Sequence, residues 1–478
     1  RSLVGSEMCI RDRITPIITN RDVTSPFLVE VQESAVKPIE PVFLDYQKDM
    51  SQLKAKSDIP VLYKQNVAND LFQLIYVFDM GNNHDKALGT AFDYLEYLGT
   101  SDMTPEELKS EFYRLACTFY VSPGNERTYV VLSGLNENMP AAVQLFEKLL
   151  ADAQVNKEAY TNMTSDILKA RSDAKLNQGQ NFSRLMSFAM YGPKSPATNL
   201  LTEAELTNMN PQELVDRIHN QNSYKHRILY YGPSSSKDLL ATINQYHQVP
   251  AALKDIPAGN EYSYLETPVT KVLVAPYDAK QIYMAQISNL DKKYDPAIEP
   301  IRALYDEYFG GGMNSIVFQE MRETRGLAYS AWASIMPPSY LKYPYVLRTQ
   351  IATQNDKMID AVTTFNDIIN NMPESEAAFK LAKDGLTNRL RTERIIKGDI
   401  IWSYINAQDL GQNVDPRIKL YNDIQNMSLK DIVDFQKQWV KGRTYVYCIL
   451  GDKKDLELDK LKAVGPIEEL TQEQIFGY

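Results

Sequence analysis

The residues best placed to do chemistry lie in the segment 309–330, which reads FGGGMNSIVFQEMRETRGLAYS. Asn314 or Ser315 can cap a helix near the start of this segment, and Gly326 is expected to end that helix. Three consecutive glycines come before the helix and predict a tight turn that other residues would adopt only at a cost: Gly310, Gly311 and Gly312. The pattern therefore predicts a turn, a helix, a second turn and a strand.

Arg322 and Tyr329 are the polar side chains of this segment that could act on a substrate. Arg322 falls late on the predicted helix, and Tyr329 falls at the start of the apolar strand that follows. The turn between them can bring the guanidinium and the phenol together as two donors for one developing oxyanion. A plainer interpretation is a surface arginine on a helix that ends at a glycine. Residue types alone favour that plainer interpretation.

An internal duplication with a period of about 219 residues divides the chain into two similar parts. Three segments of the first copy have counterparts in the second: 138–146 with 357–365, 208–216 with 426–434, and 228–232 with 447–451. We therefore predict a first domain at 14–247 and a second at 271–478. The proline-containing stretch 248–270 is predicted to be the linker between them.

Each copy has the pattern of strand, helix, strands, a run of helices and a last strand. Strands are predicted at 71–79, 128–133, 281–288 and 345–353, and helices at 86–98, 105–116, 157–190 and 297–308. Strands and helices that do not strictly alternate favour a mainly antiparallel sheet with helices packed on one face. The predicted fold class is therefore α+β, with two homologous domains.

The segment 309–330 resembles the glycine loop and Arg/Tyr region in the C-terminal half of pitrilysin-type zinc metallopeptidases. That family includes insulin-degrading enzyme and the mitochondrial processing peptidase. The match covers the triple glycine, the FQEMRE helix and the RGLAY turn. The resemblance implies that Arg322 and Tyr329 hold a peptide substrate and stabilise its tetrahedral intermediate at a zinc ion in the other half. On that interpretation the three glycines let the main chain approach the bound peptide closely, with a plain structural turn as the alternative.

The zinc motif of that family, H-x-x-E-H, is degenerate in this chain. The corresponding helix reads AFDYLEYLGT at 91–100, with Asp93 and Tyr97 at the histidine positions and only Glu96 retained. A phenol with a pKa near 10 is a poor zinc ligand, and one Asp cannot replace the usual three protein ligands. The second copy reads YDEY at 305–308. No paired spacing is present among the histidines, which we interpret as structural or surface residues: His84, His219, His226 and His247. No metal is expected in this chain, and zinc is expected in the complete enzyme.

Composition narrows the class of protein further. The 478 residues are 44% hydrophobic and 23% charged, which indicates a globular chain of more than one domain. The net charge is -10 and the basic residues are scattered, which argues against a nucleic-acid partner. No apolar run is long enough for a membrane span. Cys117 and Cys448 lie in different copies, so neither a disulfide framework nor a thiolate metal site is indicated.

The chain begins at Arg1 rather than at Met, so we expect that the start of the parent protein is missing. Residues 1–13, RSLVGSEMCIRDR, resemble a translated sequencing-adapter read-through at the edge of a metagenomic contig, and we predict that they are an artefact. The compartment is left open, with a bacterial periplasmic or secreted location as one interpretation.

Three functions remain, in order of preference. The first is the C-terminal half of a long pitrilysin-type zinc metalloendopeptidase, which forms part of the peptide-binding chamber and supplies Arg322 and Tyr329. The second is a free-standing inactive subunit that pairs with a separate zinc-bearing subunit. The third is a structural assembly protein of the same fold, which would have no use for a pair of oxyanion donors. In each case the chain is predicted to be inactive alone.

Overall fold

The computed structural model describes residues 25–35, 37, 39–279 and 281–478. The predicted artefact at 1–13 therefore lies outside the described residues. The chain divides into two compact units, 1–41 and 42–478. The described part of the first unit holds the helix α2 (Pro26–Glu33), where the Leu28 amide donates to the capping Ser25 hydroxyl. All elements that follow belong to the second unit.

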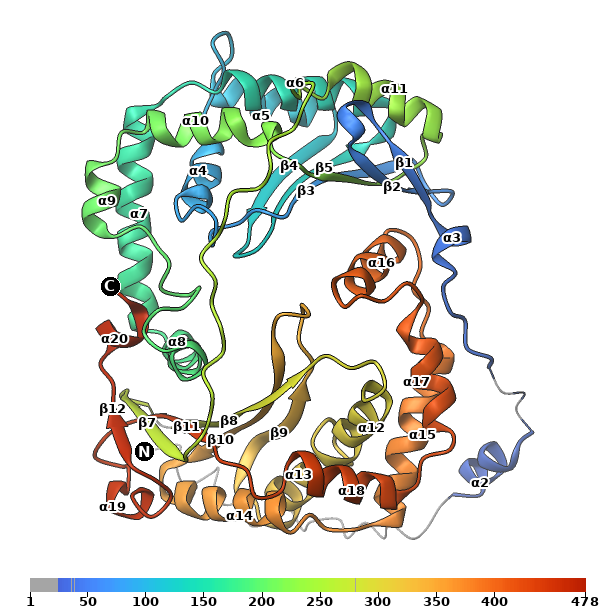
Figure 1. Cartoon of the computed structure of the whole chain (residues 1–478), viewed down its shortest axis with the longest axis vertical. Helices are drawn as coiled ribbons and strands as arrows, with labels where there is room; N and C mark the ends of the chain where they lie inside the picture. The colour runs from blue at the N-terminus through green and yellow to red at the C-terminus, as the bar shows by residue number, and fades with distance from the viewer. Residues whose placement is uncertain (1–24, 36, 38, 280) are drawn as a thin grey trace, which may run out of the picture. The chain divides into compact units, whose positions relative to one another are not determined.

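The first sheet has six strands in the order β1-β2-β6-β3-β5-β4 (Figure 1). β2 and β6 run parallel, and the other neighbouring pairs are antiparallel. The strand bounds are β1 (Ser51–Lys54), β2 (Pro60–Gln65), β3 (Leu71–Phe78), β4 (Cys117–Pro123), β5 (Thr128–Leu135) and β6 (Arg227–Gly232). Every residue of β3 from Leu74 to Phe78 is buried, and alternate residues join different apolar clusters, one on each face of the sheet.

The second sheet has six strands in the order β12-β7-β11-β8-β10-β9. Its bounds are β7 (Lys271–Pro276), β8 (Gln281–Lys293), β9 (Ala328–Met336), β10 (Pro344–Gln354), β11 (Val446–Gly451) and β12 (Ile467–Glu469). β11 lies between β7 and β8, as β6 lies between β2 and β3 in the first sheet. β9 and β4 are therefore corresponding edge strands. Both sheets are mainly antiparallel, so the predicted α+β class with two homologous sheets is confirmed.

Helices of each copy pack on one face of the sheet of that copy, as predicted. In the first copy they are α4 (Leu88–Leu95), α5 (Pro105–Arg114), α6 (Met139–Asp152), α7 (Lys157–Lys175), α9 (Glu203–Asn208), α10 (Gln212–Asn220) and α11 (Ser236–Tyr246). In the second they are α12 (Glu299–Phe309), α14 (Met358–Asn370), α15 (Glu376–Thr392), α17 (Pro416–Ile424) and α18 (Leu429–Trp439). Each of these helices carries an apolar stripe at helical spacing and buries that stripe against the sheet.

The opposite face of each sheet receives one helix from the other copy. Phe182 and Leu185 of α8 (Gln178–Tyr191) pack on β7, β8 and β11 of the second sheet. Ile401 and Ile405 of α16 (Asp399–Asp409) pack on β3, β5 and β6 of the first sheet. The domain boundaries at 14–247, 248–270 and 271–478 stay a prediction, but the packing of the two copies is reciprocal.

Most predicted elements exist with small shifts at their ends. The helix predicted at 157–190 is two helices, because the chain breaks at Leu176 and Asn177 caps α8 by accepting from the Gln180 amide at 2.9 Å. The predicted linker 248–270 contains no helix or named strand. No helix among the described residues combines the length and the apolar character needed to cross a membrane.

Candidate active site

The segment that holds Arg322 and Tyr329 folds as a capped turn of helix, a wider helical turn and an edge strand. Ser315 caps α13 (Ile316–Phe318) by accepting from the Phe318 amide at 3.4 Å. The chain continues as the π-helical turn η4 (Gln319–Thr324). Gly326 then takes a φ of +55°, a left-handed conformation that favours glycine and ends the helix. Tyr329 follows at the start of β9, so the predicted order of elements is confirmed.

The fold brings the Arg322 and Tyr329 side chains into contact. The Arg322 guanidinium carbon lies 5.0 Å from the centroid of the Tyr329 ring and 4.9 Å from that of Phe318. Its Nε atom lies 3.6 Å from a Glu323 carboxylate oxygen. Among the described residues no hydrogen bond joins the guanidinium to the phenol oxygen. The arginine is therefore stacked on the ring face, a cation–π arrangement that leaves the phenol hydroxyl free.

Both side chains remain accessible. Tyr329 is 76% exposed, and the Arg322 side chain is 38% exposed. A tyrosine ring is a large apolar surface that commonly packs against other apolar side chains. Here the Arg322 guanidinium lies over one face of the Tyr329 ring. The pair is thus held together by mutual contact and open to a ligand.

The structure gives a different physical reason for glycine at these three positions than the predicted tight turn. None of them is left-handed, and Gly310 has a φ of -143°, which any residue can adopt. A Cβ atom at Gly310 would instead lie 2.2 Å from the carbonyl oxygen of Ala333 in β9. At Gly311 it would lie 2.9 Å from the Asp306 carbonyl oxygen, whereas at Gly312 the nearest atom is 3.8 Å away. The expectation of a turn that requires glycine conformations is wrong, and close approach to β9 is the reason at Gly310.

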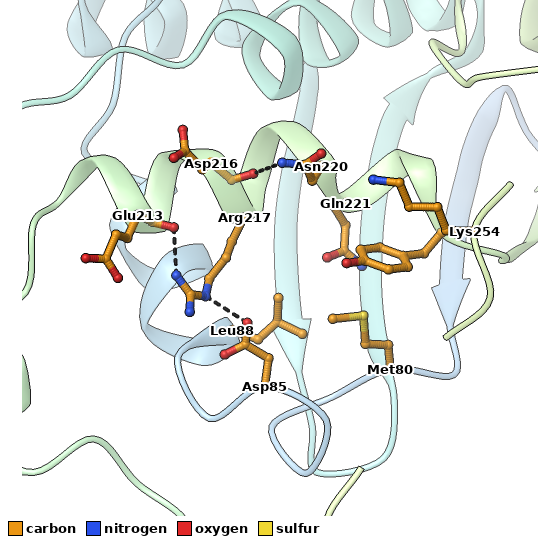
Figure 2. A pocket seen from close by; sticks show the side chains of 10 residues that line it. Met80, Asp85, Leu88, Glu213, Asp216, Arg217, Asn220, Gln221 and Lys254 are labelled. Carbon is orange, nitrogen blue, oxygen red and sulfur yellow. Dashed lines mark hydrogen bonds and ion pairs between the residues drawn. The ribbon is translucent and has the colours of Figure 1, made fainter. Parts of the chain in front are cut away.

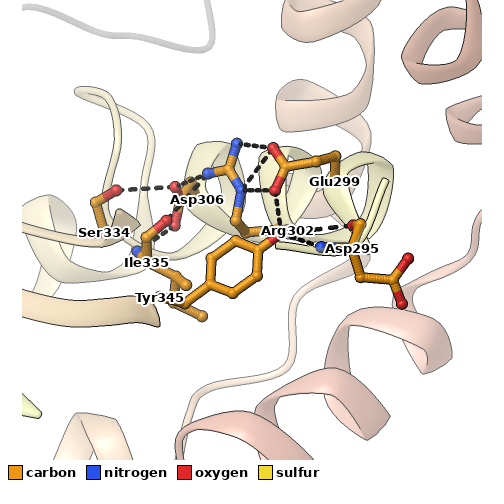
Figure 3. A network of polar contacts seen from close by, with 7 residues as sticks. All are labelled: Asp295, Glu299, Arg302, Asp306, Ser334, Ile335 and Tyr345. Atoms are coloured by element: carbon orange, nitrogen blue, oxygen red, sulfur yellow. Dashed lines mark hydrogen bonds and ion pairs between the residues drawn. The ribbon is translucent and has the colours of Figure 1, made fainter. Parts of the chain in front are cut away.

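A polar network joins α12 to the sheet beside these glycines (Figure 3). Arg302 donates from Nη2 to Glu299 at 2.8 Å and from Nη1 to Asp306 at 2.8 Å. The Tyr345 hydroxyl of β10 donates to Glu299 at 2.6 Å. Burial and this carboxylate raise the pKa of the Tyr345 phenol. The network fixes α12 against the second sheet with its charges paired.

The same network closes part of the β9 edge. The main-chain N–H of Ile335 donates to Asp306 Oδ1 at 2.8 Å, and its carbonyl accepts from Arg302 Nη1 at 3.1 Å. Ser334 donates its hydroxyl to the other Asp306 oxygen at 2.8 Å. Burial raises the pKa of Asp306 to about 6, while the Arg302 charge and these donors act in the opposite direction. Sequence reasoning did not identify this site, although the spacing of Glu299, Arg302 and Asp306 is that of ion pairs on a helix.

Only the beginning of β9 is left open. Alternate residues of an antiparallel edge strand direct their main-chain groups away from the sheet, so Ala331 and Ala333 share the outward direction of Ile335. Ala333 is covered by Gly310, and Ile335 is bonded to α12. In the described structure no hydrogen bond to the outward groups of Ala331 is present. The open portion of the edge therefore lies next to Tyr329.

The corresponding edge of the first sheet is open along its length. The main-chain N–H of Leu135 in β5 donates to the Ala116 carbonyl at 3.2 Å. Ala116 and every second residue after it therefore direct their main-chain groups toward β5. Cys117, Phe119 and Val121 therefore direct their main-chain groups outward. Among the described residues none of these groups has a hydrogen-bond partner outside the sheet. A groove of 710 Å³ lies beside this edge.

The helix that corresponds to the family's zinc helix borders this groove. Glu96, at the end of α4, lines it together with Lys109 and Tyr113 of α5. Asp93 lies on the exposed side of α4, and Tyr97 is exposed just beyond the end of that helix. Among the described residues no group of three or more His, Cys, Asp or Glu side chains could hold a metal. One carboxylate pair and a phenol do not fit a zinc site with three protein ligands.

Two of the four histidines meet in the core, which their spacing in the sequence did not indicate. The Nε2 atoms of His226 and His247 lie 2.8 Å apart, and His247 Nδ1 lies 2.6 Å from a Glu147 carboxylate oxygen. Burial and the neighbouring His247 lower the pKa of His226 to about 3. Because the two Nε2 atoms contact each other directly, this cluster ties α6, β6 and the end of α11 together.

Comparison with known proteins supports the fold and the family. The family model of the peptidase M16 inactive domain matches residues 228–386. The non-peptidase homolog YmxG of Helicobacter pylori is 23% identical over 422 residues, which are 84% of this chain and 93% of that protein.

Two solved structures share the fold at low identity. A peptidase M16 inactive domain from Pseudomonas fluorescens has a TM-score of 0.65 at 15% identity, over 84% of this chain and 98% of its own. The periplasmic protease PqqL from Escherichia coli has a TM-score of 0.67 at 12% identity, over 95% of this chain and 51% of PqqL. The same fold thus occurs in a chain of similar length and in part of a longer one.

Proposed function

We propose, from the match of the peptidase M16 inactive-domain model to residues 228–386, that this chain is the non-catalytic half of a pitrilysin-type zinc metalloendopeptidase. In this proposal it forms part of the peptide-binding chamber, and the zinc ion belongs to the zinc-bearing half. The residues of α4 do not fit zinc, so no chemical step is assigned to a metal in this chain.

The observation that carries the proposal is the contact between Arg322 and Tyr329 at the open beginning of an edge strand. A guanidinium and a phenol can both donate to a substrate carbonyl oxygen as it gains negative charge. The Tyr329 hydroxyl is exposed and can turn toward such an oxygen without breaking another hydrogen bond. We therefore assign oxyanion stabilisation to the pair, with Glu323 and Phe318 as residues that hold the arginine in place.

The substrate in this proposal is an extended peptide. An added strand bonds through its main chain, which tolerates many side chains. The uncovered main chain near Ala331 is where such a peptide would meet β9. The three glycines remain a predicted part of the substrate site, although Gly310 is already packed on Ala333. Gly312, whose surroundings are more open, is the glycine that fits this role best.

Two arrangements of the complete enzyme are consistent with the comparisons. The chain aligns with about half of PqqL, as expected of one half of a single long polypeptide. It also covers 93% of the non-peptidase homolog of H. pylori, as expected of a free-standing subunit that pairs with a zinc-bearing one. A structural assembly protein of the same fold is the remaining alternative. In both the single long polypeptide and the paired subunits, Arg322 and Tyr329 of this chain would reach a zinc site in the other half or subunit.

The test is peptide hydrolysis by the zinc-bearing half together with this chain. Arg322→Ala and Tyr329→Phe should each lower kcat by about 10²–10³, the usual effect of losing one oxyanion donor. Arg325→Ala and Tyr120→Phe are matched controls, because Arg325 lies on the same segment and Tyr120 is an exposed tyrosine of the other edge strand. Controls near wild type with both site variants impaired support the proposal. Wild-type kcat in folded Arg322 and Tyr329 variants would leave the chain with an assembly role.

A further inference from the structure

A cavity of 340 Å³ lies in the first copy, on residues that the proposed peptidase function does not use. Its walls come from α10, the short turn 221–223, the loop after β3 and the linker residue Lys254 (Figure 2). Met80 and Leu88 supply apolar surface, and the rest of the lining is polar. A concave site with some apolar wall and a few convergent polar groups is typical of a small-molecule site.

The side chain of Gln221 is the unexplained group in this cavity. It is 1% exposed, and neither its amide nitrogen nor its amide oxygen has a hydrogen-bond partner among the described residues. Its main chain is satisfied separately, because the carbonyl accepts from the Tyr224 amide at 3.2 Å. A buried amide without partners is costly, so such groups are rare unless a ligand or water completes them. Gln221 offers one donor group and one acceptor side by side.

The charged groups around the amide are only partly paired. Arg217 donates from Nε to Asp85 at 2.7 Å and from Nη1 to the Glu213 carbonyl at 2.8 Å. Lys254 places its ammonium over the Tyr224 ring at 5.7 Å. No carboxylate among the described residues forms an ion pair with Lys254. The cavity therefore combines an unpartnered amide with an unpaired ammonium.

Lys254 is held at this position by main-chain bonds. Its N–H donates to the Ser223 carbonyl at 2.8 Å, and its carbonyl accepts from the Lys225 amide at 2.9 Å. The ammonium is thus attached to the same turn that carries Gln221. Two exposed carboxylates, Glu213 and Asp216, belong to the α10 part of the lining, and Asp216 already accepts from Gln212 Nε2 at 2.9 Å. A ligand with an anionic end and a cationic end would match this distribution of charge.

We propose that this cavity binds a short zwitterionic peptide. A peptide group is the complement of the Gln221 amide, because each can donate to and accept from the other. The terminal carboxylate of the ligand would pair with Lys254, and its terminal ammonium would face Glu213. An apolar side chain would lie on Met80 and Leu88. The inference does not depend on the proposed peptidase function, since no residue is shared with that site.

The experiment is calorimetric titration of the full chain with glycyl-leucine, compared with free leucine and with glycyl-leucinamide. Glycyl-leucine should bind, whereas leucine lacks the peptide group and the amide lacks the carboxylate, so each should bind about tenfold more weakly or not at all. Gln221→Met, which keeps the shape and removes both polar atoms, should weaken glycyl-leucine binding by about tenfold or more. The free Gln221→Met protein should have an equal or higher Tm, because a buried unpartnered amide has been removed.

Lys254→Met should weaken glycyl-leucine binding by a similar factor, and it is a surface change that leaves the fold intact. Lys237→Met is the matched control, because Lys237 is an exposed lysine of α11 away from the cavity, and it should bind like wild type. Absence of glycyl-leucine binding to wild type would overturn the proposal and indicate a water-filled cavity. Unchanged binding in either the Gln221 or the Lys254 variant would also overturn it.

Discussion

The edge strands β4 and β9 occupy the same position in two sheets of the same order, yet β9 is closed over most of its length and β4 is not. β9 is bonded at Ile335 to Arg302 and Asp306, and Gly310 lies against Ala333. β4 has a groove beside it and no such contact among the described residues. An exposed edge is a template for another chain, so this difference decides where a peptide can add.

The residues of the preceding helix explain the difference. Gly99 follows α4, and Gly310 follows α12. Four and eight residues before Gly310 stand Asp306 and Arg302, whereas the same positions before Gly99 hold Leu95 and Ala91, both buried in the core. The second copy thus has polar groups that reach its own edge strand, and the first copy has none at those positions. Closing most of β9 leaves an open portion only next to Tyr329.

The largest effect is expected from removing the cation that closes β9. Arg302→Met leaves Glu299 and Asp306, whose side chains are 21% and 16% exposed, without their cationic partner. Breaking a fully buried ion pair costs about 3–5 kcal/mol of unfolding free energy, and the loss here should lie toward the lower end of that range. Urea denaturation measures the loss. Amide hydrogen exchange at Ile335 should also rise toward the rate of Val121, whose outward amide in β4 has no hydrogen-bond partner among the described residues. An Ile335 amide that exchanges as fast as Val121 in the wild-type protein would contradict the comparison.

Substituting the glycines should lower the unfolding free energy by less, and the loss should differ between Gly310 and Gly312. Gly310→Ala places a methyl group against the Ala333 main chain, and overpacking of this kind costs about 1–3 kcal/mol. Gly312→Ala is the matched control, because the nearest atom is 3.8 Å from the added carbon. Its unfolding free energy should stay within about 0.5 kcal/mol of wild type. Equal losses at the two positions in urea denaturation would show that close approach to β9 is not what Gly310 provides.

A pH dependence of stability is also expected at the closed edge. The pKa of Asp306 is raised from 3.8 to about 6 on folding, so between these values the folded state holds a proton that the unfolded state releases. This group therefore stabilises the fold at low pH, and that contribution falls as pH rises toward about 6. The difference in unfolding free energy between wild type and Asp306→Asn should shrink from pH 4.5 to pH 7. A difference that grows over this range would contradict the assignment.

Much of the local structure could be predicted from the sequence. Ser315 as a cap, Gly326 as a helix end and Tyr329 at the start of a strand all follow from short-range rules of turn and capping chemistry, and the structure confirms them. The duplicated pattern also predicted two sheets of one class. The contact between Arg322 and Tyr329 was expected from the turn between them. Its stacked form was not, because residue spacing does not fix side-chain rotamers.

Long-range packing could not be predicted in the same way. α8 and α16 each cover the sheet of the other copy, and an apolar stripe shows that a helix is buried without showing against which sheet. Glycine is needed at position 310 because of the close approach of Ala333, a strand residue that follows the intervening helix. His226 and His247 meet only because β6 and the end of α11 adjoin. Each of these features is set by contacts between segments that local patterns do not relate.

The central claim is that this chain contributes a substrate-holding pair and no zinc site of its own. Its most direct test is zinc content and peptide hydrolysis of the purified chain, alone and after addition of the zinc-bearing half. We expect no stoichiometric zinc and no hydrolysis by the chain alone, and activity in the mixture that depends on Arg322 and Tyr329. One tightly bound zinc per chain, with hydrolysis by the chain alone that a chelator blocks, would contradict it.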